Sequence, residues 1–224
     1  MFNLKFSWLL VVCLGLVGCG TKVIPVTLPE ASEAAVTKGY VRISAIDDYR
    51  NFRRSPSSPY TPSIEGDDID NPEKRRKSIG RMRHGTYQYA LWNFSFVGDE
   101  DIFGACRKIV SNSLSSAGYH VVSPDHAEYD SAIPVTIEVL EFWAWMQPKF
   151  NIDVSFDSKL RVRSELPEGG LDVTASGRHT FSTAYAGLDA WTKVVKIGVE
   201  NLHRDMLAKL GGEIREQAEK HQGN

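Results

Sequence analysis

The sequence predicts an α+β domain, built from a mixed, mostly antiparallel sheet with two amphipathic helices packed on one face. Several short segments alternate apolar and polar residues, the period of a strand, and two longer segments repeat apolar residues at helical spacing. The expected order along the chain is β–β–α–β–β–β–β–α. Because four strands follow one another between the helices, the order favours an antiparallel meander in the later part of the chain.

The first half of the domain contains two expected strands, one helix and a short third strand. The strands span 40–46 and 87–97, and the second alternates Ala, Trp, Phe and Phe on one face. Asp99 is the expected N-cap of the helix and Gly118 its C′ residue, and a short strand at 119–122 follows. The apolar positions of this helix are Ile102, Phe103, Cys106, Ile109, Val110 and Leu114.

The second half contains three longer strands and a final helix. We expect the strands at 133–146, 151–164 and 171–182, and the last two alternate apolar with charged or hydroxyl residues. One face of the sheet should therefore be wet and the other should hold the helices. The final helix is expected over 188–210, ended by Gly211 and Gly212.

The strand at 133–146 departs from simple alternation near its end, where Leu-Glu-Phe-Trp-Ala-Trp-Met is apolar on both faces. A bulge near Glu141 would exchange the two sets of side chains but cannot bury both. Either the long loop or the C-terminal segment covers the excess, or the strand presents an exposed contact surface. The candidate contact residues are Leu140, Phe142, Trp143 and Trp145.

A long polar stretch, 47–85, is expected to be a loop, and loops of this length are usually functional or disordered. It has an acidic group followed by a basic one. The acidic residues are Glu65, Asp67, Asp68 and Asp70; the basic residues are Lys74, Arg75, Arg76, Lys77, Arg81 and Arg83. Two interpretations remain: a solvated loop whose halves attract each other, or a basic loop that contacts an anion or a lipid headgroup.

Composition indicates a folded domain with no preference for nucleic acid. The chain has 224 residues, 42% hydrophobic and 24% charged, with a formal net charge of −2. Of three cysteines, only Cys106 lies within the expected domain, so no internal disulfide is expected there. Its position on the apolar helix face predicts a buried, inert thiol.

The N-terminus has the pattern of a signal peptide. Lys5 precedes an apolar run, Phe6–Val17, that is shorter than the roughly 20 residues a membrane-spanning helix needs. The run ends in Leu16-Val17-Gly18-Cys19, which resembles the lipobox of bacterial lipoproteins. The alternative is a buried helix that contains a cysteine.

The lipobox resemblance implies cleavage before Cys19, acylation of that cysteine, for example with palmitate, and a membrane anchor. Residue 20 is glycine rather than aspartate, which favours the outer membrane, facing the periplasm. The expected organisation is a signal peptide at 1–18, a lipidated tether at 19–37, a single periplasmic domain at 38–212 and a charged tail at 213–224.

No pattern of residues predicts catalysis, a metal or a cofactor. None of the six histidines has metal-ligand spacing on one helix, although His120 and His126 flank a turn and could meet. The sequence lacks a nucleophile elbow, a phosphate-binding loop and a dinucleotide fingerprint. Asp47 and Asp48 form a carboxylate pair at a strand end, where aspartates commonly make turns. We therefore expect no enzyme, cofactor or metal site.

Several segments are similar to a known family. The helix followed by Ala117-Gly118-Tyr119-His120-Val121, with Tyr129-Asp130 before the next strand, resembles YajG-like envelope lipoproteins of proteobacteria. Ile79–Gly85 and Phe142–Trp145 resemble a subgroup of that class. The resemblance implies an α+β periplasmic domain on a lipid anchor, without known catalytic residues.

Three classes of function follow from these observations. The first is a non-catalytic accessory lipoprotein that docks to an envelope protein complex, and we favour it. The second is a protein that binds a lipid or other amphiphile at Trp143 and Trp145. The third is an envelope hydrolase whose site has no recognisable motif.

Overall fold

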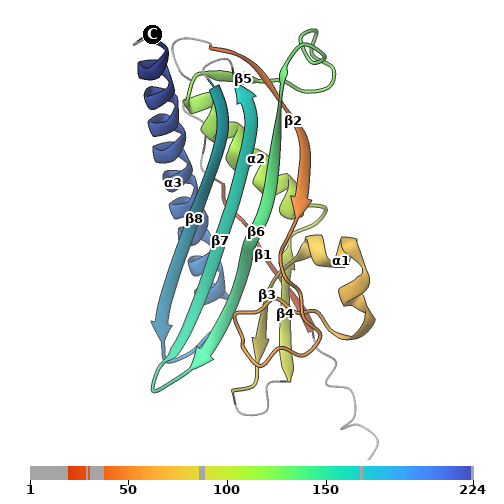
Figure 1. The fold of residues 1–224 in the computed structure, drawn as a ribbon. Coiled ribbons are helices and arrows are strands. Elements are labelled where there is room, and N and C mark those ends of the chain that lie inside the picture. The colour runs from red at the N-terminus through yellow and green to blue at the C-terminus, as the bar shows by residue number, and fades with distance from the viewer. Residues whose placement is uncertain (1–19, 29, 31–37, 86–88, 167–168, 223–224) are drawn as a thin grey trace, which may run out of the picture.

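The protein is an α+β domain, as predicted. A computed structural model describes residues 20–28, 30, 38–85, 89–166 and 169–222, with side chains to residue 212. These residues form one eight-stranded mixed sheet, three α-helices and a short 3-10 helix, Gly66–Asp70 (Figure 1). The strands are β1 (Gly20–Ile24), β2 (Gly39–Asp48), β3 (Ser78–Arg83), β4 (Ala90–Phe96), β5 (Tyr119–Val121), β6 (Ile133–Pro148), β7 (Ile152–Leu166) and β8 (Gly169–Thr183).

The long strand β6 organises the sheet. Along one edge it pairs with β7 from Val135 to Pro148, and β7 pairs with β8, both antiparallel. The other edge is divided: β2 pairs with residues 133–139 of β6, and β3 pairs with residues 144–145. The sheet therefore forks, with β2 and β5 on one branch and β3, β4 and β1 on the other.

The expectation of a mostly antiparallel sheet is wrong, because four of the seven strand pairings are parallel. The meander β6–β7–β8 is antiparallel, as its short connections require. Of the earlier strands, only β3 and β4 follow one another across a short connection, and they too are antiparallel; the others are separated by long connections that impose no direction. Consequently β2 and β3 both align parallel with β6.

Two of the helices follow the expected segments, with changes at their ends. The helix α2 spans Ile102–Ser116, and Asp101 rather than Asp99 caps it, accepting a hydrogen bond from the Gly104 N–H at 2.9 Å. Gly118 has a φ of 98°, which fits the predicted C′ glycine. The helix α3, Leu188–Gln222, continues through Gly211 and Gly212, so the predicted stop is wrong. Glycine inside a helix costs only about 1 kcal/mol each.

The third helix, α1 (Pro72–Lys77), lies in the stretch expected to be a loop. Asn71 caps it and Pro72 occupies its first turn, a combination that favours a helix start. The prediction of two helices on one face is therefore wrong in number. None of the helices within the described ranges is long and apolar enough to cross a membrane.

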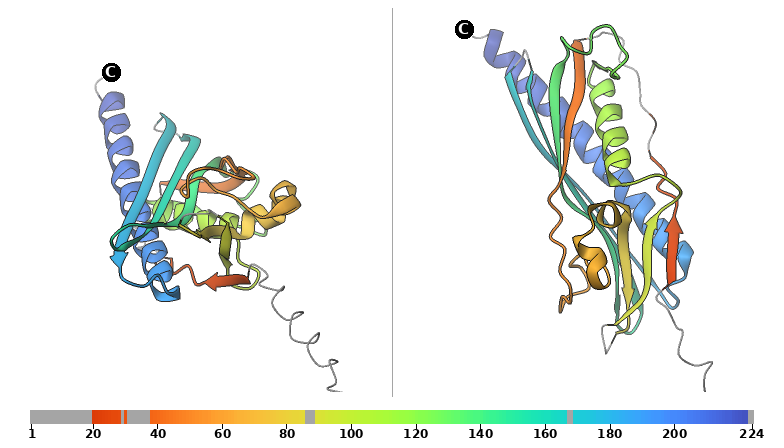
Figure 2. Two further views of the ribbon diagram at one scale, coloured as in Figure 1. Left: turned by 90° about the horizontal axis from the view of Figure 1, so that it is seen from below. Right: turned by 90° about the vertical axis from the view of Figure 1, so that its right-hand side faces the viewer.

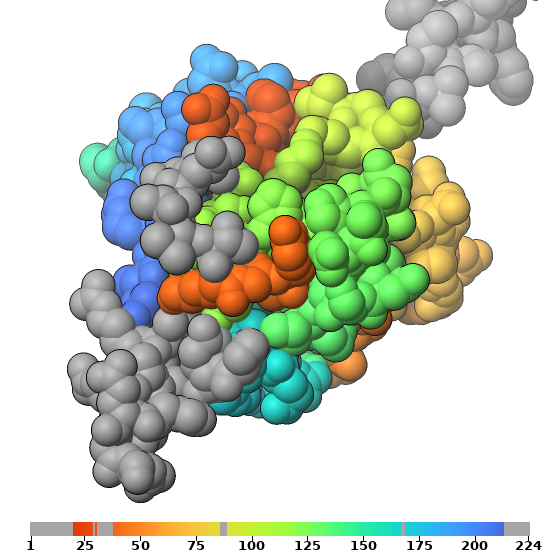
Figure 3. Space-filling view, turned by 90° about the horizontal axis from the view of Figure 1, so that it is seen from above, coloured from red at the N-terminus to blue at the C-terminus, as the bar shows by residue number. Residues whose placement is uncertain are grey.

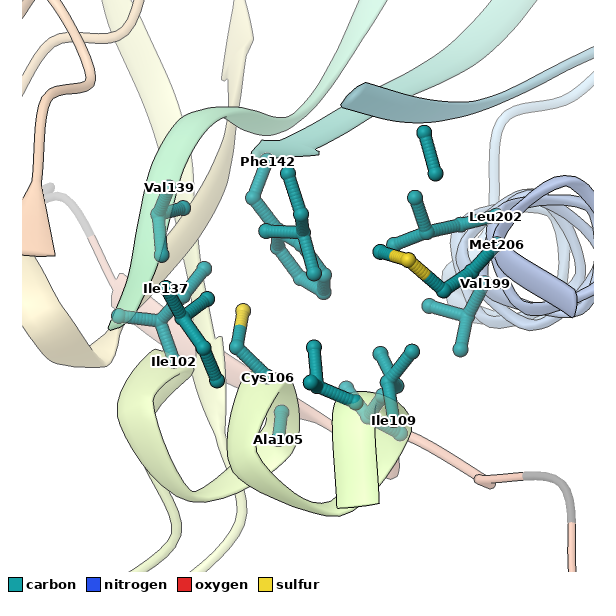
Figure 4. Packing of buried hydrophobic residues seen from close by; sticks show 14 of the residues in the cluster. Ile102, Ala105, Cys106, Ile109, Ile137, Val139, Phe142, Val199, Leu202 and Met206 are labelled. Atoms are coloured by element: carbon teal, nitrogen blue, oxygen red, sulfur yellow. The ribbon is translucent and has the colours of Figure 1, made fainter. Parts of the chain in front are cut away.

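The hydrophobic core lies between the sheet and its two longer helices. Figure 2 shows α3 running obliquely along the sheet, where it contacts β8 and β7. In Figure 4 the Cys106 thiol points from α2 into the cluster that includes Ile137 and Phe142. The thiol is fully buried, and burial raises its pKa well above the usual value, so it stays protonated. The predicted burial of this cysteine is confirmed.

The backbones of α3 and β8 are in direct contact where two glycines face each other. A Cβ atom on Gly177 would lie 2.2 Å from the Gly198 carbonyl oxygen and 2.4 Å from the Leu202 nitrogen. A Cβ atom on Gly198 would meet the Phe156 ring at 2.3 Å. The helix can approach the strand this closely only because both residues lack side chains.

The start of the described chain is a strand, not a tether. Residues 20–24 form β1, which pairs in parallel with β4, and Ile24 and Val26 are buried in the core. The predicted tether at 19–37 is therefore wrong for residues 20–28. The predicted signal peptide at 1–18 and Cys19 lie outside the described residues.

Candidate functional site: an aromatic pocket under a covering loop

A β-bulge in β6 sets the orientation of the aromatic segment. The pairing with β7 shifts register between Val139 and Glu141, near the bulge position that the sequence suggested. Val139 and Phe142 consequently both face the core and are fully buried. Trp143 and Trp145 lie on the opposite face. Phe142 is therefore wrongly placed in the candidate contact surface, because it is a core residue.

The segment between β2 and the 3-10 helix, residues 49–65, covers these tryptophans, and we call it the cover loop. Trp143 and Trp145 are only 3% and 5% exposed. The Trp143 indole Nε1 donates to the Pro59 carbonyl at 3.4 Å, and Phe52 packs edge-on against the same ring at 5.8 Å between centroids. The Tyr60 ring packs edge-on against Trp145, with 6.3 Å between the ring centroids. The prediction of an exposed aromatic surface at these two residues is therefore wrong. The alternative prediction, that the long loop folds over the strand and covers them, describes the structure.

Two arginines of β3 hold the cover loop in place. Arg83 donates to the Pro56 carbonyl at 3.0 Å, to the Ser58 carbonyl at 3.4 Å and to the Ser63 hydroxyl. Arg81 donates to the same hydroxyl and lies 3.6 Å from the Glu65 carboxylate. Burial, with the nearby Arg81 charge, lowers the pKa of Arg83 to about 10, so Arg83 remains a cation at neutral pH. The charge-assisted hydrogen bonds of Arg83 satisfy loop carbonyls that water would otherwise solvate.

The six predicted basic residues do not form one solvated loop. Arg81 and Arg83 are buried in β3, whereas Lys74 to Lys77 belong to α1. Within α1, Lys74 and Lys77 are exposed, and the two arginines between them are half-buried. A continuous basic surface is therefore wrong for Arg81 and Arg83, which are occupied with the cover loop.

A fully buried arginine, Arg50, closes the fork in the sheet. Its guanidinium binds both carboxylate oxygens of Asp48 at 2.9 Å. It also donates to the carbonyls of Ser78 and Arg75 at 2.7 Å and of Phe142 at 3.3 Å. These groups lie between the end of the β2 pairing at Val139 and the start of the β3 pairing at Ala144, where β6 has no strand partner on this edge. One side chain thus replaces the missing strand hydrogen bonds.

The Asp48–Arg50 pair explains the carboxylate at the end of β2. Burial alone would raise the pKa of Asp48, but the hydrogen bonds and charge of Arg50 outweigh it and lower the pKa below its usual value. The predicted pairing of Asp47 with Asp48 does not form a site. Asp48 instead orients Arg50, a structural role that its position in the sequence does not reveal.

A pocket of about 300 Å³ opens beside the buried tryptophans, between the cover loop and strands β6 and β7. Tyr60 at its mouth is 63% exposed. Glu141 and Asp157 are the charged side chains among the described residues that line it. The complete lining is Tyr49, Asn51, Tyr60, Thr61, Pro62, Leu140, Glu141, Trp143, Trp145 and Asp157. We call it the aromatic pocket.

The electrostatics of the aromatic pocket favour a cation. Burial raises the pKa of Asp157, Arg178 at 3.2 Å partly offsets this, and the nearby Glu141 raises it further. Glu141 itself pairs with Lys159 at 3.7 Å. Aromatic faces attract cations through their quadrupole, and two carboxylates add to that attraction. The pocket therefore suits an apolar group that carries a positive charge.

The histidines that flank the predicted turn do meet, at the opposite end of the sheet. His120 and His126 have ring centroids 5.7 Å apart, and the Tyr40 ring lies 5.5 Å from each. Figure 3 shows this end, with the loop between β5 and β6 beside β2. Within the described ranges, no group of three His, Cys, Asp or Glu side chains is arranged to hold a metal ion.

Comparisons with known proteins give only distant structural likenesses. No family model and no curated protein matches the chain. The crystal structure of protein XCC0632 from Xanthomonas campestris, of family DUF330, matches with a TM-score of 0.43 and 8% identity, over 91% of this chain and 99% of that one. An uncharacterized protein matches with a TM-score of 0.39 and 12% identity, over 88% and 98%. The resemblance to YajG-like lipoproteins is not confirmed by these matches.

Proposed function

We propose that this protein is a non-catalytic lipoprotein of the bacterial envelope that docks to another envelope protein through the aromatic pocket. Acylated Cys19 holds it on a membrane, which we take to be the outer membrane, with the domain in the periplasm. The single observation that carries the docking role is the pocket itself. It combines exposed Tyr60, the edges of two tryptophans and two carboxylates in one preformed cavity.

The pocket suits a partner that presents a lysine or arginine side chain. The aliphatic stem of such a residue packs on aromatic rings while its charge approaches Glu141 and Asp157. Aromatic residues are also enriched in the energetically important parts of protein interfaces. A cover loop tied down by arginines keeps the pocket open before the partner arrives, which lowers the entropic cost of binding.

The anchor is tested by labelling cells with a clickable fatty acid. Wild type should incorporate the label because the thiol of Cys19 accepts a lipid, and Cys19→Ser should not. Cys106→Ser is the matched control and should keep the label, since that thiol is buried. Equal label in wild type and Cys19→Ser contradicts the anchor.

Docking is tested by photo-crosslinking from the mouth of the pocket. A benzophenone amino acid replaces Tyr60 in the full chain, expressed in the native host, and the adduct is identified by mass spectrometry. The matched control carries the same group at Tyr40, an exposed tyrosine at the far end of the sheet. We expect one discrete protein adduct from position 60, absent from position 40 and lost when Glu141→Gln and Asp157→Asn are added. An adduct that survives removal of both charges contradicts the proposed recognition.

A second candidate is an amphiphile with a cationic headgroup, and the two carboxylates beside the tryptophan rings are the observation in its favour. The cavity is at the lower end of the size range of small-molecule sites. The same photo-crosslinking experiment separates the candidates. Adducts of lipid mass at position 60 support the amphiphile, and protein adducts support the docking role.

A further inference from the structure

The chain direction places several connections at one end of the molecule. β6 runs toward its turn at Pro148, β3 runs parallel to it, and β4 returns in the opposite direction. β1 is parallel to β4, so it begins at the end where β3 and β6 finish. β8 finishes there too, and α3 starts there (Figure 1). We call this end the anchor end; it contains Gly20, the turn 149–151 and the loop 184–187.

The anchor end exposes large apolar side chains. Phe150 in the β6–β7 turn is 104% exposed, and Tyr185 in the loop before α3 is 80% exposed. Trp92, the register partner of Gly20, is partly exposed, and the Lys22 ammonium lies 4.2 Å from the centre of its ring. Tryptophan, tyrosine and lysine near a membrane surface are typical of interfacial anchoring.

The opposite end has different chemistry. The loop between β5 and β6 that closes it carries three acidic residues, Asp125, Glu128 and Asp130. A bilayer with anionic lipids repels such a surface, whereas it accepts aromatic side chains and lysine. The two ends of the sheet therefore differ in the way that an oriented, membrane-bound domain requires.

The register of the strands gives the reach of this end. Gly20 pairs with Trp92 of β4, and Trp92 pairs with Met82 of β3. Because the preceding residue, Arg81, pairs with Trp145, Gly20 is level with the residue of β6 that follows Trp145. β6 continues for about two more residues to Pro148, roughly 7 Å at 3.3 Å per residue, before the turn that holds Phe150. The Cα of Cys19 lies about 3.8 Å from that of Gly20 because the two residues are bonded. The β6–β7 turn therefore reaches farther beyond Gly20 than Cys19 can.

We propose that the anchor end lies on the phospholipid bilayer, with Phe150 and Tyr185 inserted into its interfacial layer. This inference rests on the proposed acylation of Cys19. β1 starts at the residue after the anchor, so no free tether separates the sheet from the lipid. The polar layer on each side of a bilayer is roughly 5–7 Å thick. With the strands perpendicular to the membrane plane, a turn that projects past the acylated Cys19 enters that layer. The domain then stands on the membrane with its acidic end farthest away.

The test uses the lipidated full chain in vesicles of phosphatidylethanolamine and phosphatidylglycerol. Phe150→Cys is labelled with a polarity-sensitive fluorophore, and lipids with nitroxide groups report contact with the bilayer. Ala127→Cys, exposed in the acidic end, is the matched control. Cys106 takes no label in the folded protein because it is buried. Flotation of the vesicles measures anchoring separately.

We expect the label at 150 to shift its emission to shorter wavelength and to be quenched by the nitroxide lipids, while the label at 127 does neither. A protein that floats with the vesicles while both labels remain in water overturns the orientation and leaves the anchor intact. A protein that does not float overturns the anchor, and the orientation with it. The two failures are therefore distinguishable.

Discussion

The two faces of β6 are buried by different means. On one face, Phe142 and Phe156 pack beneath α3, whose apolar residues repeat at helical spacing. On the other, Trp143 and Trp145 are buried by the cover loop, which has no regular secondary structure and is fixed by hydrogen bonds from Arg81 and Arg83. One face is closed by apolar packing and the other by charged side chains that satisfy backbone carbonyls.

The difference has consequences for stability and for function. Apolar packing is spread over many contacts, so the α3 face depends on the fit of its shapes. The loop face depends on a few arginines, and each leaves several polar groups unpaired when removed. A loop is also where a binding site is usually placed, on a scaffold that stays rigid. The aromatic pocket lies at the edge of the loop face.

The largest effect is expected from Arg50→Met. The substitution leaves the Asp48 carboxylate and three carbonyls without their partner in a buried site, and breaking one side of a buried pair costs about 3–5 kcal/mol. Arg54→Met is the matched control, because Arg54 forms exposed pairs with Asp67 and Asp70 and should cost less than about 1 kcal/mol. Urea titration of both variants measures the difference. Equal losses would mean that the fork does not depend on Arg50.

The α3 face is tested by Gly177→Ala. The new methyl group meets backbone atoms of α3, which cannot rotate away, so we expect a loss of about 1–3 kcal/mol. Gly170→Ala in the same strand is the control, because its methyl group would lie 3.6 Å from the Glu165 carboxylate. Thermal unfolding should show a lower melting temperature for the first variant alone. A stabilised Gly177→Ala would refute the close contact of helix and strand.

A smaller and more local effect is expected from Arg83→Met. The cover loop should open while the α3 face stays packed, and the cost should be about 1–2 kcal/mol because the released carbonyls regain water. Amides of residues 53–64 should exchange hydrogen faster, and tryptophan emission should move to longer wavelength. Unchanged exchange in the loop would show that the arginine does not hold it.

The two faces of β6 also differ in how far the sequence predicts them. The α3 face has the periodicity of helix and strand, and the segments around Phe156 and Leu202 are where their patterns place them. The loop face has no period. Its order depends on Arg50 and Arg83, which donate to backbone carbonyls, and on Arg81, which donates to the Ser63 hydroxyl. A backbone carbonyl is present in every residue, so the sequence does not mark these acceptors. The sequence predicts the covering loop only indirectly: two tryptophans on the face expected to contact solvent require another segment to bury them.

Strand pairing was the other feature beyond prediction. Apolar alternation identifies β2, whereas β3 lies in the stretch that was expected to be a loop. The sequence does not give the neighbours or direction of either strand, because both join β6 across long connections. The contact of Gly177 with Gly198 shows the same limit. Each glycine is unremarkable in the sequence, and only the packed structure brings them together.

The most direct test of the docking role is a comparison of stability with partner recovery in Tyr60→Ser. The photo-crosslinker is placed at Tyr49, which lines the same pocket, so that position 60 is free to vary. Because Tyr60 is largely exposed, the urea midpoint should correspond to a change within about 0.5 kcal/mol. We predict that the protein adduct from position 49 is lost although the fold is unchanged. Retention of the adduct at wild-type yield, with an unchanged midpoint, would contradict the assignment of this pocket as the docking site.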